Sequence, residues 1–411
     1  MDSLKAFEFD ERWYLDTYQD VAAAVSRGEW PSGYMHYCVV GRSNGQTGAP
    51  SIDEEWYRAT YPLAATELAE GKATDFRDHY YRIGRFRGYL PHDKATRPEN
   101  PSGFRSHFGG LWTDQGNALD VVAGRLDLGL ITSEQAALLT KWILDGFVII
   151  KNAIPEDILA RATDDMNAAH EGRFAAVRFD IHEKGRQRPW THEVQAGATK
   201  ALDLHWFSDP VRDLIFAPKV LAFLHLLFER RVLATQSLGF WRGSAQEGHQ
   251  DSAYVNYSLP MQFAASWIAL EDVQPGAGEL FYHVGSHRMA EHLYHGKFKG
   301  LADAERAGAD QNLLTKQVGV HVSRIDEQAR GMSLETRLLH VKRGDVLFWA
   351  ADLAHGGRPI SLSQTRKSVV THYCPAEVVP SYFEIKPGRM VRSHKGVAFY
   401  SSTYYDRPTE S

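Results

Sequence analysis

A histidine and an aspartate two residues apart, in the stretch Gly248-His249-Gln250-Asp251, have the types and spacing needed to hold a metal ion. In an extended segment alternate side chains share a face, so His249 and Asp251 point the same way and Gln250 points away. One imidazole and one carboxylate supply two ligands of the facial triad that binds non-haem iron, and a second histidine would complete it. Such a triad leaves three positions on ferrous iron open for a bidentate cosubstrate and oxygen. Because a His-x-Asp triplet is common by chance, the prediction of a metal site depends on finding a third ligand.

His355 is the candidate for that third ligand. It follows the apolar run Val346–Ala350 and precedes two glycines, which predicts a position at the end of a buried strand, near the mouth of a barrel. Arg366 lies eleven residues further on, at the start of the next apolar run. If the two strands pair, both side chains enter one cavity. A guanidinium there can bind the distal carboxylate of 2-oxoglutarate through two parallel hydrogen bonds.

The stretches around these residues resemble the phytanoyl-CoA dioxygenase family. They are GHQD at 248–251, SWIALEDV at 266–273, GAGELFYHVGSHR at 276–288, GDVLF at 344–348, and His355 with Arg366 at the family's spacing. The resemblance spans residues 130–380 and implies a double-stranded β-helix core. It also implies that His249, Asp251 and His355 hold Fe(II) and that Arg366 anchors 2-oxoglutarate, the cosubstrate used with O2.

The resemblance further implies that Trp267 lines the cosubstrate pocket, although a tryptophan at this position is also compatible with a purely structural role in the core. Gln236 and Arg242 lie upstream of the triad on an expected strand, and we expect Gln236 to contact the cosubstrate or the substrate. Gly356-Gly357 stands where a Gly-Ser pair is common in the family. One hydroxyl contact to the cosubstrate is therefore expected to be absent or replaced.

Five further histidines have no ligand spacing, and we expect most of them to be structural or at the surface. They are His283, His287, His321, His340 and His372. A glycine-rich nucleotide-binding fingerprint is absent, because the glycines of Gly276-Ala277-Gly278 mark a turn between strands.

Short strands dominate the chain from residue 231 onward, and helices precede them. Strands are expected at 231–241, 253–259, 263–272, 279–283, 337–341, 345–350 and 366–374. Helices are expected at 133–145, 155–170 and 218–229, with a short strand at 147–151. This pattern favours an all-β core with flanking helices, arranged as a jelly roll of the cupin-like kind.

A long polar stretch, 288–335, interrupts the strands and is expected to form an insertion or lid. Basic side chains gather at its start. We expect them either to meet a carboxylate or phosphate on the substrate or to form a solvated face: they are His287, Arg288, His292, His295, Lys297 and Lys299.

The first hundred residues contain an internal repeat with a period of 43 residues. The residues Asp10, Glu11, Trp13, Tyr14, Tyr18, Gly28, His36, Tyr37, Gly41 and Arg42 recur as Asp53, Glu54, Trp56, Tyr57, Tyr61, Gly71, His79, Tyr80, Gly84 and Arg85. A fixed period of this length predicts two copies of one helical unit. The units resemble WY-rich repeats found beside bacterial polysaccharide-related domains.

These features predict three parts. Residues 1–98 hold the two helical repeats (8–50 and 51–92), 99–118 form a Pro- and Gly-rich linker, and 119–411 form the dioxygenase domain. No repeat residue completes the iron site, so we expect the repeats to be separable from the chemistry. They either bury their own aromatic faces or mediate contact with a partner or a second copy.

Together the motifs predict an Fe(II)- and 2-oxoglutarate-dependent dioxygenase. The expected reaction is hydroxylation of an unactivated C–H of a small-molecule or sugar-linked metabolite, with release of succinate and CO2. Desaturation, ring closure and epimerisation use the same ligands and stay open. So do a cupin-like metal enzyme that does not use 2-oxoglutarate and a non-catalytic binding protein with a degenerate barrel. Arg366 counts against the former, and the intact triad counts against the latter.

Composition limits the remaining classes. The chain has 411 residues and a formal net charge of −5, which gives no reason to expect nucleic acid as a partner. Two cysteines far apart fit a reducing compartment. The first residues lack the apolar stretch of a secretory signal, and no apolar run is long enough to span a membrane. We therefore expect a cytoplasmic protein with a small-molecule substrate.

Overall fold

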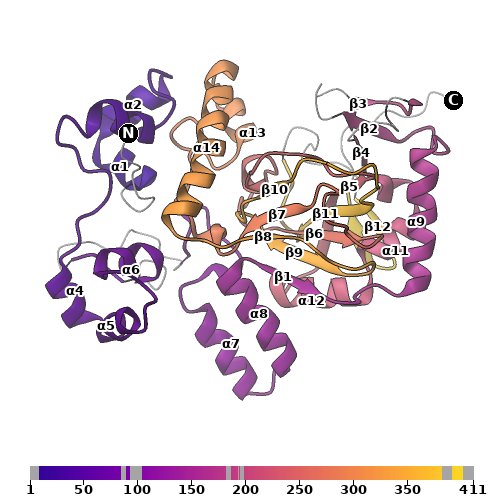
Figure 1. Ribbon diagram of the computed structural model, residues 1–411, viewed down its shortest axis with the longest axis horizontal. Helices are drawn as coiled ribbons and strands as arrows, with labels where there is room; N and C mark the ends of the chain where they lie inside the picture. Colours follow the sequence, from indigo (N-terminus) through magenta and orange to yellow (C-terminus); the bar gives the residue numbers. More distant parts are fainter. Residues whose placement is uncertain are drawn as a thin grey trace.

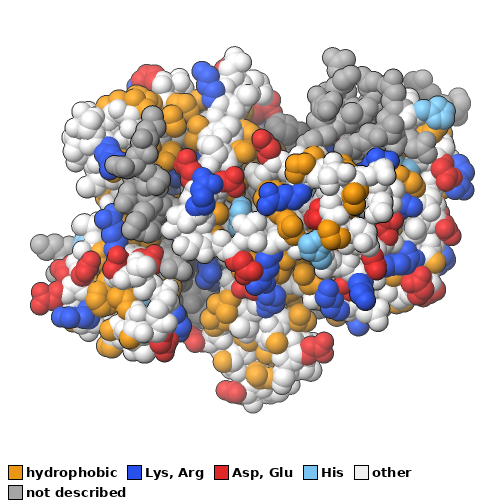
Figure 2. All heavy atoms as spheres, in the orientation of Figure 1, with side chains coloured by type: hydrophobic (Ala, Val, Ile, Leu, Met, Phe, Trp, Pro, Cys, Tyr) orange, Lys and Arg blue, Asp and Glu red, His pale blue; other side chains and the backbone are white. Residues whose placement is uncertain are grey.

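The computed structural model describes residues 9–84, 89–92, 104–181, 187–192, 194, 199–381 and 391–400. A small helical body at the N-terminal end stands beside a larger β-core, and a long helix lies between the two (Figure 1). Among the described residues no helix is both long and apolar enough to cross a membrane. Acidic and basic side chains are intermixed over the face seen in Figure 2.

Two β-sheets form the core. The larger sheet runs in the order β1-β9-β6-β11-β5-β4-β2-β3, and the smaller one in the order β10-β7-β8. The strands of the larger sheet are β1 (Phe147–Ile150), β2 (Arg178–Ile181), β3 (Gln187–Arg188), β4 (Thr199–Leu202), β5 (Val232–Phe240), β6 (Ala264–Ala269), β9 (Val346–Ala350) and β11 (Ser368–Pro375), with β12 (Arg392–His394) and β13 (Val397–Phe399) attached beside β5. Those of the smaller sheet are β7 (Leu280–His283), β8 (Thr336–Leu338) and β10 (His355–Gly357). The expected jelly-roll core is confirmed.

Side chains alternate between the two faces of the larger sheet because the strand period is two residues. In β9, Val346 and Phe348 pack outward in the cluster that contains the flanking helices, whereas Leu347 and Trp349 face inward. A bulge in the pairing of β5 with β11 lets Leu238 face inward although Ala234 packs outward. One face of the sheet therefore builds the main core, and the other face lines an interior.

Helices cover the outer face of the larger sheet, as expected. They are α7 (Ala118–Asp127), α8 (Ser133–Asp145), α9 (Glu156–His170), α11 (Asp209–Ile215) and α12 (Pro218–Phe228). The bounds of α8 follow its caps: Thr132 and Gln135 form a capping box, and Gly146 ends the helix with a φ of 79°. Trp142 of α8 and Phe223 of α12 pack edge to face over the sheet, with ring centroids 5.7 Å apart.

The strand expected at 253–259 is wrong. Asp251 begins a short 3₁₀ helix that ends at Ala253, and the segment beyond it makes only an isolated bridge between Tyr257 and Pro380. Its alternating apolar residues pack in a side cluster instead of a ladder. Pro260 adds a reason, because a proline lacks the N–H that a central strand must donate.

The insertion is helical. It contains α13 (Leu301–Arg306) and the 21-residue α14 (Gln311–Gly331), which is the long helix between the N-terminal body and the β-core (Figure 1). Asp310 caps the start of α14 by accepting hydrogen bonds from the backbone of Asn312 and Leu313.

The N-terminal helical region expected from the sequence is present. The first copy contains α1 (Glu11–Thr17), α2 (Gln19–Ser26), α3 (Gly33–His36) and a short π-helical turn (Tyr37–Gly41). The second contains α4 (Glu54–Thr60), α5 (Pro62–Ala69) and α6 (Phe76–Arg82). Equivalent hydrogen bonds hold both, since the Tyr14 hydroxyl lies 2.9 Å from His36 Nδ1 and the Tyr57 hydroxyl lies 3.0 Å from His79 Nδ1.

The described part of the expected linker, residues 104–118, is packed. Leu111 is 2% exposed and belongs to the main core, and Thr113 accepts a hydrogen bond of 3.1 Å from the indole of Trp142. Polar and glycine-rich composition suggested a linker, but these two side chains tie the segment to α8. A chain beginning at residue 119 would therefore lose part of the core under that helix.

Candidate metal centre

The structure brings His249, Asp251 and His355 together in a cavity between the two sheets. The backbones of the two histidines pair directly: His249 N–H donates to His355 O over 2.8 Å, and His355 N–H donates to His249 O over 2.9 Å. Gln250 is extended, with φ −114° and ψ 129°, so its neighbours share one face although the segment is not a regular strand.

The three side chains converge on one point. His249 Nε2 lies 3.7 Å from Asp251 Oδ1, and His355 Nε2 lies 3.8 Å from the same oxygen. One ligand atom from each residue falls within 4.8 Å of the others, which is the span of a single metal ion. Two imidazoles and one carboxylate are the donors of a facial iron triad.

Each histidine is oriented through the nitrogen that faces away from this point. The Nδ1 of His249 lies 2.9 Å from the carbonyl of Glu247, and the Nδ1 of His355 lies 2.9 Å from the carbonyl of Leu353. Because a carbonyl only accepts, both Nδ1 atoms carry the proton and both Nε2 atoms present lone pairs. Burial, reinforced by His355, lowers the pKa of His249 to about 4, so this imidazole stays neutral at neutral pH.

The Asp251 carboxylate is held by two further side chains. The indole of Trp349 donates to Oδ2 over 2.8 Å, and His372 Nε2 lies 3.4 Å from the same oxygen. Burial alone would raise the pKa of Asp251, but the neighbouring histidines, His355 and His372 foremost, hold it well below its usual range. The carboxylate therefore stays ionised, with Oδ1 turned toward the two imidazoles.

A cavity of about 510 Å³, including its mouth, contains this cluster. It is lined by Lys200, Leu238, Phe240, Ser244, Gln246, His249, Asp251, Trp267, Leu280, Trp349, His355, Gly356, Gly357, Arg366, Val370 and His372. These residues come from both sheets, so the cavity is the interior of the jelly roll.

Arg366 enters the cavity just before β11. The pairing of its strand with that of His355 does not occur, because β10 pairs with β7, and β11 pairs with β5 and β6. Arg366 is 3% exposed, donates through Nη1 to the carbonyl of Gly278, and leaves Nε without a hydrogen-bond partner among the described residues. Burial lowers its pKa to about 10, yet it remains a cation at neutral pH.

The other two expected cosubstrate residues differ in position. Trp267 of β6 lines the cavity, 5.6 Å from the Arg366 guanidinium, and its indole nitrogen is buried without a partner in the described structure. Gln236 lies opposite His372 in the ladder of β5 and β11 but is not among the residues that line the cavity. Arg242 does not line the cavity either.

Sequence reasoning missed four residues of this site. His372 was expected to be structural, and Trp349 was treated only as part of a strand, although both contact Asp251. Lys200 lines the cavity from β4 and pairs with Asp180 over 3.3 Å. The side-chain nitrogen of Gln246 lies 3.2 Å from His249 Nε2. The nearness of Gln246 to His249 in the sequence, three residues before it, could have indicated this contact.

The basic cluster at the start of the insertion does not line the metal cavity. Lys299 pairs with Asp352 over 2.6 Å, and His292 stacks on His321 with ring centroids 4.6 Å apart. His287 lies 3.3 Å from Arg105 Nη1. These side chains hold the insertion in place.

A model of the family described as phytanoyl-CoA dioxygenase matches residues 142–368, more than half of the chain. The chain belongs to the phytanoyl-CoA dioxygenase family. The match contains all three candidate ligands and Arg366. Enzymes of this phytanoyl-CoA dioxygenase type depend on Fe(II), 2-oxoglutarate and O2, and the expected class is therefore confirmed at that level.

Solved structures similar to this family member include the α-ketoglutarate-dependent epimerase SnoN from nogalamycin biosynthesis, at 15% identity and a TM-score of 0.42, over 64% of this chain and 95% of that one. The carbocyclase SnoK from the same biosynthesis has 16% identity and a TM-score of 0.47, over 64% and 95%. EctD from S. alaskensis with 2-oxoglutarate and 5-hydroxyectoine has 16% identity and a TM-score of 0.44, over 66% and 88%. No curated protein matches the sequence.

The residues of this phytanoyl-CoA dioxygenase family member fit the cofactors of the family. Two Nε2 lone pairs and one carboxylate oxygen offer the donor set that ferrous iron takes. Among the described residues the Nε of Arg366 and the indole N–H of Trp267 have no hydrogen-bond partner, and both are buried donors that a dicarboxylate would satisfy.

Proposed function

We propose that this protein is an Fe(II)- and 2-oxoglutarate-dependent hydroxylase, with His249, Asp251 and His355 as metal ligands and Arg366 as the anchor of the cosubstrate. One observation carries the proposal: three preoriented ligand atoms and a buried, incompletely paired guanidinium share one cavity. Iron and 2-oxoglutarate, when bound, supply the oxidising power needed to hydroxylate an unactivated C–H bond.

The chain contributes positioning and exclusion of water. Trp349 and His372 fix the carboxylate of Asp251, and the backbone bridge fixes the spacing of the two imidazoles. Arg366 orients the cosubstrate through a charge-assisted contact. Apolar side chains such as Leu238 and Val370 line the cavity and keep it dry, which protects reactive species from side reactions.

The cavity supports a small-molecule substrate with an anionic or sugar-linked group. Its lining combines apolar and polar side chains, as small-ligand sites do. Lys200 adds a second cation to its lining beside Arg366. The basic residues of the insertion do not contribute, so Lys200 is the side chain on which an anionic preference rests.

The proposed catalytic unit begins before residue 119. Because Leu111 and Thr113 are tied to the core, we place its start before residue 111.

A succinate-detecting screen of small metabolites, run with Fe(II), 2-oxoglutarate and O2, tests the proposal. A hydroxylase gives a product 16 Da heavier than the substrate, with one succinate per product. A product of unchanged mass, or one lighter by two hydrogens, would replace hydroxylation with epimerisation or with desaturation and ring closure.

A second measurement separates the other classes. Anaerobic addition of Fe(II) and then 2-oxoglutarate gives a visible charge-transfer band when the keto acid chelates bound iron. Iron binding without the band would favour a metal enzyme that does not use 2-oxoglutarate. A protein that binds neither would be a non-catalytic binding protein.

A further inference from the structure

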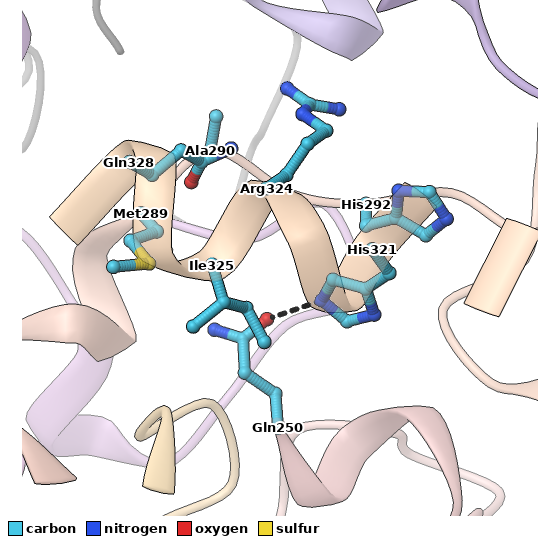
Figure 3. Close-up of a pocket in the computed structure, with 8 residues that line it drawn as sticks. All are labelled: Gln250, Met289, Ala290, His292, His321, Arg324, Ile325 and Gln328. Carbon is cyan, nitrogen blue, oxygen red and sulfur yellow. Dashed lines mark hydrogen bonds between the residues drawn. The ribbon is translucent and has the colours of Figure 1, made fainter. Parts of the chain in front are cut away.

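Gln250, the residue between two candidate ligands, points away from the metal cavity and toward the long helix α14 (Figure 3). Its side chain is 4% exposed and makes two hydrogen bonds. The amide nitrogen donates to the carbonyl of Asp352 over 2.7 Å, and the amide oxygen lies 3.0 Å from His321 Nε2. The turn that carries Asp251 is thus fastened both to the segment that precedes His355 and to α14.

The directions of these bonds are fixed. The carbonyl of Asp352 only accepts, so the Gln250 nitrogen faces it and the Gln250 oxygen faces His321. His321 Nε2 therefore carries the proton, and its Nδ1 accepts from the Tyr294 hydroxyl over 2.8 Å. No partner in this chain of bonds can turn without leaving a buried polar atom unpaired, which makes the connection stiff.

One turn further along α14, Arg324 lines the same small pocket as His321 and Gln250 (Figure 3). Its guanidinium reaches the first repeat, where Nη1 lies 3.2 Å from Glu11 Oε2. Arg324 is 4% exposed and Glu11 is 1% exposed, so this ion pair is buried. The guanidinium also lies over the Tyr34 ring, 4.4 Å from its centroid.

Two backbone N–H groups hold the Glu11 carboxylate in position for its ion pair with Arg324. The two carboxylate oxygens accept from the backbone N–H groups of Gly33, over 2.7 Å, and of Tyr34, over 3.1 Å. Burial raises the pKa of Glu11, and Arg324 opposes that rise. A buried carboxylate without a partner would strongly destabilise the fold, whereas a paired and hydrogen-bonded one is tolerated.

Apolar contacts extend the same interface. Leu293 of the insertion packs in a buried cluster with Phe9 and Tyr14 of the first repeat. Gly28 lies against Leu313 at the start of α14, and a side chain added there would begin 3.4 Å from it. The first repeat is therefore docked on the insertion along the length of α14.

From these contacts we infer that the first repeat positions the metal-binding turn through α14, with Gln250 and His321 as the positioning residues and Glu11 with Arg324 as the attachment. The coupling between the first repeat and the turn is inferred from the described contacts alone. Its effect on metal binding rests on the proposed function. It replaces the expectation that both repeats are separable from the chemistry.

The second repeat supplies a matched control. Glu54 occupies the place of Glu11 one period later, yet it is exposed. Gly71 occupies the place of Gly28, and no described residue lies within 4 Å of a side chain added there. In the described structure these positions contact the insertion from the first copy.

The test uses the full-length chain with Glu11→Gln, His321→Phe, both together, and Glu54→Gln as the control. Glu11→Gln removes the charge and keeps an acceptor for the Gly33 N–H. His321→Phe removes both hydrogen bonds and keeps a ring against His292. Glu11→Ala and His321→Gln complete the set, because His321→Gln restores a donor to Gln250 and should recover most of the effect.

The first readout is hydrogen exchange of the metal-free protein over residues 249–255, where His249 and Ser252 donate backbone hydrogen bonds. Exchange should be faster in Glu11→Gln and in His321→Phe, and unchanged in Glu54→Gln. The second readout is Fe(II) affinity by anaerobic calorimetry, which should fall about tenfold, as for residues that support metal ligands. The double variant should lose little more than one single variant, because both act on one path.

Unchanged exchange over 249–255 in folded Glu11→Gln and Glu11→Ala proteins would overturn the inference, as would fully additive losses of affinity. If the variants show the exchange effects but the unaltered protein binds no iron, the proposed function fails and the coupling stands. If it binds iron and the variants change neither readout, the coupling fails and the proposed function stands.

Discussion

Replacing Arg366 with alanine gives the sharpest test of the cosubstrate site. In the folded protein the guanidinium is buried beside Trp267 and donates to a backbone carbonyl, and its Nε has no partner in the part of the chain that the structure describes. Burial lowers its pKa from its ordinary value to about 10, which corresponds to roughly 3 kcal/mol of lost stabilisation of the cation. A dicarboxylate that binds there would recover much of that energy.

The expected loss follows from this balance. Removing a charge-assisted, two-point contact costs on the order of 2–4 kcal/mol, or roughly 30- to 1000-fold in 2-oxoglutarate affinity. The 2-oxoglutarate affinity of Arg366→Lys should lie between those of the unaltered protein and Arg366→Ala, since lysine keeps the charge and loses the planar fork. Without cosubstrate, Arg366→Ala should unfold at nearly the same temperature, because an unfavourably buried cation is removed.

The assay is anaerobic titration of 2-oxoglutarate into the Fe(II)-loaded protein, followed by calorimetry and by the visible charge-transfer band. Arg358→Ala is the control, because Arg358 is an exposed arginine eight residues away that does not line the cavity. An Arg366→Ala protein that folds and binds 2-oxoglutarate as tightly as the unaltered chain would refute the assignment.

Three further predictions concern the metal ligands, their support and the pH dependence of folding. His249→Ala, Asp251→Ala and His355→Ala should each abolish Fe(II) binding in calorimetry and leave the circular dichroism spectrum unchanged; retained binding in any two would remove the triad. Trp349→Phe should weaken Fe(II) binding about 10- to 100-fold by releasing Asp251, whereas Trp112→Phe, outside the cavity, should not. Burial lowers the pKa of His170 to about 4, so the unfolded chain binds a proton there between pH 6.5 and 4 and the folded chain does not. Stability should therefore fall as pH falls through this window, by about 1.4 kcal/mol per pH unit, and urea unfolding should show a flatter profile for His170→Phe; parallel profiles would contradict this.

The three candidate ligands could be selected from the sequence because their chemistry is local. A His-x-Asp pair and a histidine at the end of a buried strand are visible in one dimension, and the two-residue period of strands fixes which side chains share a face. His372 could not be predicted in this way. It meets Asp251 only because β11 lies beside β6 and β5 in one particular register.

The helices of the insertion could not be predicted for a different reason. The buried face of helix α14 is half polar: Gln317, His321, Arg324 and Gln328 are buried beside Leu313, Leu314, Ile325 and Ala329. A search for apolar periodicity finds such a helix poorly. Polar side chains are buried there because they have specific partners, among them Gln250 and Glu11. Those partners are far away in the sequence.

The hydrogen-bonded backbone bridge between His249 and His355 has a consequence for how the proposed site gains and loses its metal ion. Because the backbone itself sets the spacing of the two imidazoles, we expect the proposed site to assemble without an ion. We then expect the protein to release ferrous iron and take it up again while it stays folded. The proportion of active molecules would then follow the supply of iron around them, and chelation would silence the protein reversibly without sending it to degradation.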